Sequence, residues 1–288
     1  MDDIIVIVGP TGVGKTKLSI LLAKKLNAEI INADSVSIYK GLDIGSAKPT
    51  KEERQEVPHH LIDIRNTSEE YSIFDYQKDA RAKIEEIRKK GKRVIIVGGT
   101  GLYIKSALYN YNFTENTTYN EYNDLTNEEI LKKIHTTNKF IDIHVNNRKR
   151  LVRTLNKLEN NEEITNNKDE LLYNVKIIGL TTERDILYER INKRVDDMVS
   201  FGLLDEIEHL KDEYKESRIL NNAIGYKEFK NYNGTNLEEI KNEIKKNSRH
   251  YAKRQYTFFN HQMNVTWFNV DFSNFINTYL EVEKFLKV

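Results

Sequence analysis

The sequence predicts an α/β fold: a doubly wound parallel sheet with an inserted, mainly helical subdomain and a helical C-terminal part. In the first half of the chain, short β-branched runs alternate with segments whose apolar residues have helical spacing, a pattern typical of βαβ units. A polar stretch interrupts this alternation, and the last third contains no proline, since none lies beyond Pro58. We therefore expect a core made of residues 1–111 and 144–288, with residues 112–143 as the inserted subdomain.

The first strands and helices follow one another in the order that such a sheet requires. Residues 4–8 (IIVIV) are the first expected strand, and residues 16–26 the first helix. Residues 29–35 and 93–97 are the next strands, with a charged amphipathic helix over residues 75–90 before the second of them. Ligands bind outside the carboxyl ends of the strands in such sheets, so the loops that follow these strands should meet at one edge.

The second half of the chain changes character twice. Residues 112–143 are rich in Asn, Thr, Glu and Tyr, with weak apolar periodicity up to about residue 130, and we interpret them as the inserted helical subdomain. Residues 175–180 (VKIIGL) return to strand character. Residues 184–201 and 202–262 then show helical spacing with few breakers, which predicts a mostly helical C-terminal third.

The composition favours a cytoplasmic protein without a membrane span. No apolar run approaches the roughly 20 residues that cross a bilayer, and no basic region or cleavage site precedes the first strand. The chain has no cysteine, which excludes disulfides, thiolate nucleophiles and cysteine-bound zinc. The net charge of +1 does not by itself predict a polyanionic partner, and we expect a monomer.

Residues 9–16 (GPTGVGKT) match the phosphate-binding pattern G-x-x-x-x-G-K-[ST] directly after a strand and at the start of a helix, which is the context that the pattern requires. The backbone N–H groups and the helix N-terminus would hold an anion, Lys15 would reach its outer phosphate, and Thr16 could bind Mg²⁺. The pattern therefore predicts a P-loop NTPase-like sheet and a polyphosphate ligand, without naming the organic group. The candidate diphosphate-binding residues are Gly9, Pro10, Thr11, Gly12, Val13, Gly14, Lys15 and Thr16.

The acidic residue expected near a P-loop follows a different strand from the one that carries it in ordinary P-loop ATPases. An ordinary P-loop ATPase has a second strand that ends in an acid to hold magnesium, whereas residues 93–97 are followed by glycines. An acid occurs instead as Asp34, at the end of the strand over residues 29–35. From its position, Asp34 could be a general base, a metal ligand through water or a helix cap.

Two basic segments lie in this nearly neutral chain. Residues 148–157 hold five basic and no acidic side chains, and residues 241–255 hold six Lys or Arg and one Glu. Either segment could be a solvated helix face. In the second, Tyr251 and the nearby Tyr256 alternate with the cations, which suits phosphate contacts combined with base stacking.

With these motifs in order, the chain resembles the tRNA dimethylallyltransferase family over nearly its whole length. This resemblance implies that a dimethylallyl group moves from dimethylallyl diphosphate to the N6 amine of the adenosine just 3′ of the anticodon, in tRNAs that read codons beginning with U, forming N6-isopentenyladenosine. The blocks that carry it are GPTGVGKT (9–16), EIINADSVSIYKGLDIGSAKPT (29–50), PHHLIDI (58–64), VGGTGLYIKSAL (97–108), IHVNNRKRLVRTL (143–155), RINKRVDDM (190–198), AIGYKE (223–228) and SRHYAKRQYTFF (248–259).

The resemblance also implies roles for single residues. Asp34 would take the proton from the attacking amine, Lys15 and a Mg²⁺ ion on Thr16 would neutralise the leaving diphosphate, and Arg184 would reach it too. The adenine would be flipped into the pocket, and the anticodon stem-loop would be gripped by the basic segments and by the inserted subdomain. The residues expected to contact tRNA are Asp34, Ser35, Val36, Ser37, Thr100, Arg148, Lys149, Arg150, Arg153, Arg249, Lys253, Arg254 and Gln255.

Three alternatives remain at this point. A P-loop small-molecule kinase would share the phosphate-binding loop, but it is usually smaller and gives no account of the basic C-terminal helix. An adenylate isopentenyltransferase, which modifies free AMP or ADP, would not need two basic segments. A non-enzymatic RNA-binding module is hard to reconcile with Lys15 and Thr16 beside Asp34.

Overall fold

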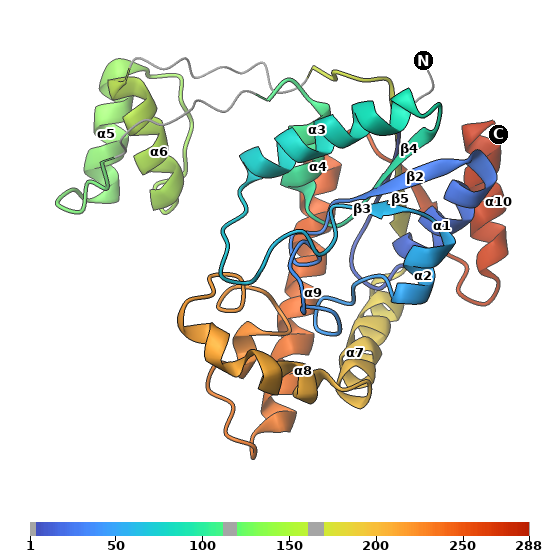
Figure 1. Cartoon of the computed structure of the whole chain (residues 1–288). Coiled ribbons are helices and arrows are strands. Elements are labelled where there is room, and N and C mark those ends of the chain that lie inside the picture. The colour runs from blue at the N-terminus through green and yellow to red at the C-terminus, as the bar shows by residue number, and fades with distance from the viewer. Residues whose placement is uncertain (1–3, 112–119, 161–169, 288) are drawn as a thin grey trace. The chain divides into compact units, whose positions relative to one another are not determined.

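A computed structural model of the chain describes residues 4–111, 120–160 and 170–287. It confirms the α/β fold: the described strands form one six-stranded sheet of parallel pairs, in the order β3-β2-β4-β1-β5-β6 (Figure 1). The strands are β1 (Ile4–Val8), β2 (Ala28–Asn32), β3 (His59–His60), β4 (Arg93–Val97), β5 (Val175–Thr181) and β6 (Thr266–Asn269).

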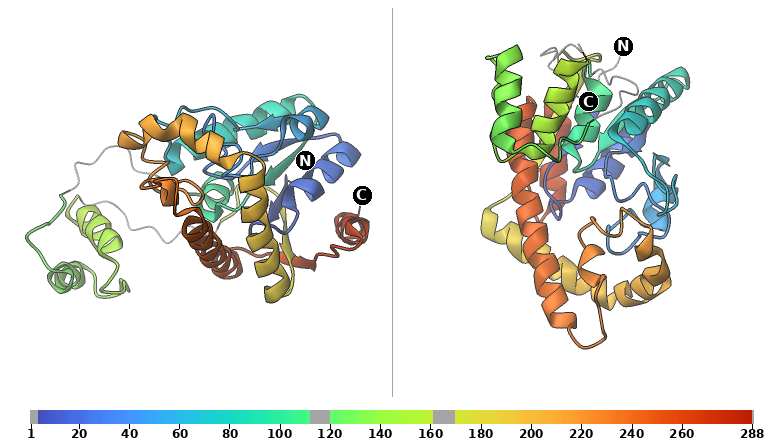
Figure 2. Two further views of the ribbon diagram at one scale, coloured as in Figure 1. Left: turned by 90° about the horizontal axis from the view of Figure 1, so that it is seen from below. Right: turned by 90° about the vertical axis from the view of Figure 1, so that its left-hand side faces the viewer.

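Helices cover both faces of this sheet, so its central strands are apolar on both sides. One face packs on α1 and α10 through residues such as Leu22 and Val282, and the other packs on α3, α4 and α9 through Ile84, Ile104 and Phe259 (Figure 2). The helices of this part are α1 (Lys15–Leu26), α2 (Lys51–Glu56), α3 (Ile73–Lys89), α4 (Gly101–Leu108), α7 (Arg184–Ser200), α8 (Leu203–Leu210), α9 (Leu237–Gln262) and α10 (Phe275–Leu286), with 3₁₀ turns at Lys211–Lys215 and Lys227–Phe229. None of the described helices is long and apolar enough to cross a membrane.

The C-terminal third is mostly helical, as expected, but it also supplies the sixth strand. Strand β6 pairs in parallel with β5 at the edge of the sheet, with Gly179 opposite Trp267. The sequence does not predict it because the strand has only four residues, which are exposed or half-buried, and so lacks the apolar run of a central strand. The chain then turns into α10, which begins at Phe275.

Residues 110–170 form a second compact unit, built on the helices α5 (Asn127–Thr137) and α6 (Arg148–Glu159). The insertion is helical where described, as expected, while residues 112–119 lie outside the described residues. The boundary at residue 143 is wrong, because the unit extends to Glu170. The amphipathic α6 buries Leu151 and Leu155 against Ile130 and Ile134 of α5, and so belongs to the insertion rather than to the core.

Candidate active site

The loops after β1, β2 and β4 meet at the carboxyl edge of the sheet, as the sequence predicts. The loop after β1 ends at Gly14, whose φ of 93° is the left-handed conformation, and α1 begins at Lys15. The first N–H groups of α1 have no partner within the helix, so this end of α1 carries partial positive charge. The Lys15 ammonium donates a hydrogen bond to the Pro10 carbonyl across the loop at 2.7 Å.

Two cations and one carboxylate occupy this edge. Burial of the ammonium group and the nearby positive charge of Arg194 lower the pKa of Lys15 to about 7, although the carboxylate of Asp34 opposes this shift. Burial also lowers the pKa of the Arg194 guanidinium, against the influence of Asp34. Because two poorly solvated cations face a single carboxylate, the site favours an added anion.

The Asp34 carboxylate is held in place by its own turn. The Asp34 N–H donates to the Asn32 side chain at 3.1 Å, and the Asn32 amide in turn donates to the Leu61 carbonyl at 3.0 Å. Oδ1 of Asp34 accepts the N–H of Val36 at 2.9 Å. Within the described residues, Oδ2 has no hydrogen-bond partner and is available to a ligand.

Thr100 and Ser35 join the loops after β4 and β2. The Thr100 hydroxyl accepts the Ser35 N–H at 3.1 Å and donates to the Ser35 hydroxyl at 3.3 Å. The Thr100 N–H donates to the Ala33 carbonyl at 3.0 Å. Both hydroxyls therefore lie next to Asp34, whereas Ser37, expected to contact tRNA, is only 3% exposed.

Gln255 is buried and fixes the site from α9. Its amide donates to the Gly99 carbonyl at 3.0 Å and accepts the Thr11 N–H at 3.2 Å. A Cβ at Gly99 would overlap this amide, so the glycine allows the close approach. Gln255 thus links the P-loop to the turn after β4. The sequence suggested an exposed RNA contact at this position, but the residue is buried.

Tyr251 lies one turn before Gln255 on α9 and faces the same site. Burial and the negative charge of Asp34 raise the pKa of the Tyr251 phenol to about 12, so it remains a neutral hydroxyl near Asp34. The sequence marks this residue as an aromatic among cations, and its approach to the reaction centre depends on the packing of α9.

Arg190 and Arg194 are site residues that the sequence motifs do not single out, although both lie in the block RINKRVDDM. Their i, i+4 spacing on the helix after β5 places them on one face, and this spacing is the signal that could have identified them. Arg190 donates to the carbonyl of Gly12 at 3.0 Å. Arg184, expected at the diphosphate, instead lies 5.1 Å from the Tyr188 ring and lines a separate cavity of about 340 Å³ with Lys253.

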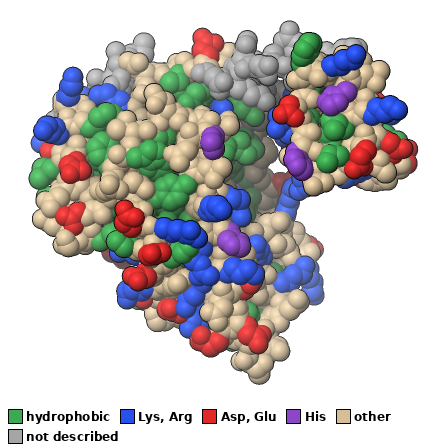
Figure 3. All heavy atoms as spheres, turned by 180° about the vertical axis from the view of Figure 1, so that it is seen from behind, with side chains coloured by type: hydrophobic (Ala, Val, Ile, Leu, Met, Phe, Trp, Pro, Cys, Tyr) green, Lys and Arg blue, Asp and Glu red, His purple; other side chains and the backbone are tan. Residues whose placement is uncertain are grey.

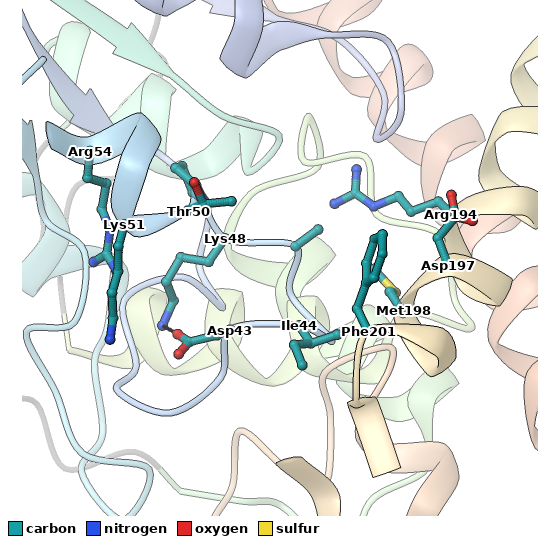
Figure 4. Close-up of a pocket in the computed structure, with 12 residues that line it drawn as sticks. Asp43, Ile44, Lys48, Thr50, Lys51, Arg54, Arg194, Asp197, Met198 and Phe201 are labelled. Carbon is teal, nitrogen blue, oxygen red and sulfur yellow. Dashed lines mark hydrogen bonds and ion pairs between the residues drawn. The ribbon is translucent and has the colours of Figure 1, made fainter. Parts of the chain in front are cut away.

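A larger cavity of about 510 Å³ opens beside Arg194 (Figure 4). Arg194, Asp197, Met198 and Phe201 line it from one side, and the segment from Asp43 to Arg54 lines it from the other. The second wall is fixed because the Glu206 carboxylate accepts the N–H groups of three successive residues, Asp43, Ile44 and Gly45, at 3.0, 2.8 and 3.1 Å.

The basic segments are partly exposed and partly used inside the protein. Lys253 and Arg254 of α9 are exposed, and Figure 3 shows Lys and Arg side chains gathered on the lower half of the face opposite to that of Figure 1. Arg249 donates to the Asn192 side chain at 2.7 Å. On α6, Arg148 donates to the carbonyls of Tyr122 and Leu125 at 2.6 and 2.9 Å, while Lys149, Arg150 and Arg153 are exposed.

Comparison with known proteins agrees with this geometry. Residues 37–262 match the family model described as IPP transferase. The chain is 47% identical to a tRNA dimethylallyltransferase of Bacillus licheniformis, covering 93% of this chain and 90% of the relative, and 48% identical to that of Bacillus velezensis, covering 92% and 90%. Neither relative is named as a kinase or as an adenylate isopentenyltransferase.

Solved structures are similar over the whole fold. A tRNA isopentenylpyrophosphate transferase from Bacillus halodurans has a TM-score of 0.77 at 40% identity, covering 100% of this chain and 96% of the other. A eukaryotic dimethylallyltransferase described as acting on tRNA has a TM-score of 0.82 at 27% identity, covering 98% and 77%. With the family model matching most of the chain and relatives near half identity, the chain belongs to the IPP transferase family.

Proposed function

We propose that this protein transfers a dimethylallyl group from dimethylallyl diphosphate to the N6 amine of the adenosine 3′-adjacent to the anticodon, in tRNAs that read codons beginning with U. The product is N6-isopentenyladenosine. The observation that carries the proposal is the pairing of two poorly solvated cations, Lys15 and Arg194, with a carboxylate whose Oδ2 is free, at Asp34. Membership of the IPP transferase family supports this assignment.

The cations stabilise the leaving group. As N6 attacks C1 of the prenyl group, the C1–O bond breaks and its electron pair stays on the diphosphate. The loop N–H groups, Lys15 and Arg194 bind that developing charge in a poorly solvated site, where fixed charges are worth more than in water. Arg184 lies with Tyr188 and Lys253, and this step is derived without it.

Asp34 takes the proton that N6 loses. Its Oδ1 is engaged by the Val36 N–H, so the carboxylate is oriented and Oδ2 remains to accept the proton. The hydroxyls of Ser35 and Thr100 lie beside it, and they would contact the edge of the adenine. An adenine stacked in the anticodon loop cannot reach this depth, so the base is flipped out of the loop.

Magnesium fits this site as a partner of the diphosphate. The described residues contain no cluster of three or more His, Asp or Glu side chains that could hold a metal, so the protein would offer mainly the Thr16 hydroxyl. Mg²⁺ is commonly held in this way, by few protein groups, substrate phosphates and water. When bound, the ion would neutralise part of the diphosphate charge.

The exposed cations bind the RNA. We assign phosphate contacts with the anticodon stem-loop to exposed side chains, which are Lys253 and Arg254 on α9 and, on α6 of the insertion, Lys149, Arg150 and Arg153. Such contacts give affinity and register, while the flipped base is read in the pocket. We also propose that the protein acts as a monomer.

A label-transfer assay tests the proposal. Purified protein with Mg²⁺ and radiolabelled dimethylallyl diphosphate should label an anticodon stem-loop that has adenosine after the anticodon, and should not label the same stem-loop with guanosine there. AMP is added as a competing acceptor. Label in AMP and none in RNA would instead identify an adenylate isopentenyltransferase, and phosphoryl transfer from ATP to a small molecule would identify a kinase.

A further inference from the structure

The outer side of the P-loop is covered by aromatic side chains of the C-terminal segment. Phe275, in the first turn of α10, lies against Gly14: a Cβ on that glycine would be 2.7 Å from the Phe275 ring. The Lys17 ammonium lies 4.9 Å from the centre of the same ring. Phe275 is only 8% exposed, so the ring is packed onto the loop and does not extend into solvent.

A second aromatic contact continues this cover. The Arg190 guanidinium lies 3.8 Å from the centre of the Phe272 ring and also donates to the Gly12 carbonyl at 3.0 Å. Phe272 is thus linked to the P-loop through Arg190. We refer to Phe272, Phe275 and Arg190 together as the aromatic cover.

Sheet topology explains how the cover arises and why it is fixed. Strands β1, β5 and β6 are neighbours, so the loop after β6 lies at the same edge as the P-loop and the start of α7. Asp271 holds that loop: its carboxylate accepts the N–H groups of Ser273 and Asn274 at 3.0 and 2.9 Å, and the Asn277 amide at 2.8 Å. The Ser273 hydroxyl also donates to this carboxylate at 2.6 Å, and this hydrogen bond, together with those from Asn274 and Asn277, lowers the pKa of Asp271 to about 2.

The two ends of the P-loop, which is the anion cradle, differ in whether the organic part of a ligand extends from them. In a P-loop that binds a nucleoside triphosphate, the lysine reaches the outer phosphates, so the nucleoside lies at the other end of the cradle. In the proposed reaction, the organic group of the donor must lie at the Lys15 end instead, because its C1 has to face Asp34. The end away from Lys15 can therefore be closed without hindering the donor.

We propose that the aromatic cover excludes nucleosides from the P-loop and so selects a prenyl diphosphate over ATP and GTP. This inference rests on the proposal that the P-loop holds the donor diphosphate. Phe275 occupies the surface over Gly14 and Lys17, and Arg190 with Phe272 occupies the surface beside Gly12. A base or ribose at that end would have to displace packed side chains, a steric form of selection against the wrong ligand.

Titration calorimetry with Mg²⁺ separates this selection from diphosphate binding itself. The probes are inorganic pyrophosphate, which has no organic group, and ATP, which has one. The wild-type protein should bind pyrophosphate at least about tenfold more tightly than ATP. Phe272→Ala and the double variant Phe272→Ala/Phe275→Leu should tighten ATP binding by about tenfold or more, and change pyrophosphate binding less than about threefold.

Phe285→Ala is the matched control, because Phe285 also lies on α10 but packs on Phe268, at 5.5 Å between ring centres, and should leave the ratio of the two affinities unchanged. Phe272 is half-buried, so its single variant should remain folded even if the double variant does not. Equal affinities of the wild type for ATP and pyrophosphate, or a folded Phe272→Ala protein with an unchanged ratio, would overturn the inference. A wild type that binds no pyrophosphate would instead contradict the proposed donor site.

Discussion

Glu29, which is buried, and Lys15, which is half-buried, are charged side chains at opposite edges of the sheet, and the protein compensates their charges differently. Glu29, near the start of β2, is 3% exposed and is surrounded by Lys92 at 2.8 Å, His60 at 2.6 Å and Lys90 at 3.5 Å. Burial alone would raise the Glu29 pKa, but the hydrogen bonds from Lys92 and His60 lower it to about 2. The protein itself neutralises this charge.

Lys15, at the carboxyl edge, is compensated only in part, by the nearby carboxylate of Asp34. Its ammonium donates to a neutral carbonyl, of Pro10, and its pKa falls to about 7 by burial and by the charge of Arg194. Removing a charge whose partners lie within the protein should leave those partners uncompensated, whereas we expect a ligand to complete the charge of Lys15. Variants of Asp34, Lys15 and Glu29 test that distinction.

Asp34→Asn should produce the largest effect. Removing the proposed base should lower turnover by about 10²–10⁴-fold and leave stem-loop affinity within about threefold, because the amide can still accept the Val36 N–H that orients the side chain. Single-turnover label transfer and filter binding measure the two quantities. Asp205→Asn, at an exposed position of α8, is the control, and an active Asp34→Asn enzyme would remove Asp34 from the mechanism.

Lys15→Met and Glu29→Gln should give opposite results. Lys15→Met should lower kcat/KM by about 10²–10³-fold without lowering the free energy of unfolding, because it removes a charge that the protein compensates only in part. Glu29→Gln should lower the free energy of unfolding by about 1–3 kcal/mol, since its cations are partly exposed and solvent screens them, and leave kcat/KM within about twofold. Urea unfolding and label transfer give the four values. If Glu29→Gln were as inactive as Lys15→Met, the proposed distinction between a structural charge at Glu29 and a ligand-binding charge at Lys15 would be wrong.

The sequence predicts the part of this site that depends on local pattern. Lys15 and Thr16 follow from a contiguous motif in its strand and helix context, and Asp34 from its place at the end of a strand. The central strands are predicted by apolar runs, and the long helices by the periodicity of their apolar residues, because both are also local patterns. These features require only the knowledge that parallel strands share an edge.

Features that depend on packing between distant segments are not predicted in this way. Arg194 approaches Lys15 and Asp34 only because α7 packs beside the P-loop, and Gln255 is buried only because α9 crosses Gly99. In the sequence, Gln255 lies among cations and resembles an RNA contact. The end of the insertion is misplaced for a similar reason, since α6 looks like a basic surface helix until Leu151 and Leu155 are seen to pack on α5.

The low pKa of Lys15 predicts a pH dependence of donor binding. The diphosphate binds the charged ammonium, so the Lys15 pKa rises in the complex, and binding takes up a proton above about pH 7. Affinity for pyrophosphate should therefore fall as pH rises above 7, by up to about tenfold per pH unit. Lys15→Arg should weaken this dependence because a guanidinium stays protonated. Calorimetry in buffers of different ionisation enthalpy counts the protons, and zero uptake at pH 8 would contradict the prediction.

The same two side chains make the free energy of unfolding rise with pH in two separate windows. For Lys15, the folded pKa of about 7 lies below the unfolded value of 10.5, so this group makes the free energy of unfolding rise with pH between 7 and 10.5. For Glu29, the folded pKa of about 2 lies below 4.5, so its contribution is present above pH 4.5 and lost as pH falls toward 2. Urea unfolding of Lys15→Met and Glu29→Gln across these windows should remove each slope separately, and slopes equal to the wild type would contradict the assignments.

The exposed cations on α9 and α6 should give the smallest effects. Lys253→Gln/Arg254→Gln should weaken stem-loop binding at every sequence alike, and should reduce the slope of log K against log salt by about 0.7–0.9 for each phosphate that the variant no longer neutralises. Lys149→Gln/Arg150→Gln should do the same if α6 also binds phosphates, while kcat with saturating RNA should stay within about twofold in both variants. Lys211→Gln, in the exposed turn after α8, is the control. An unchanged salt slope for one pair would indicate that its helix is a solvated surface and does not bind RNA phosphates. The two helices would then differ in function although both are basic.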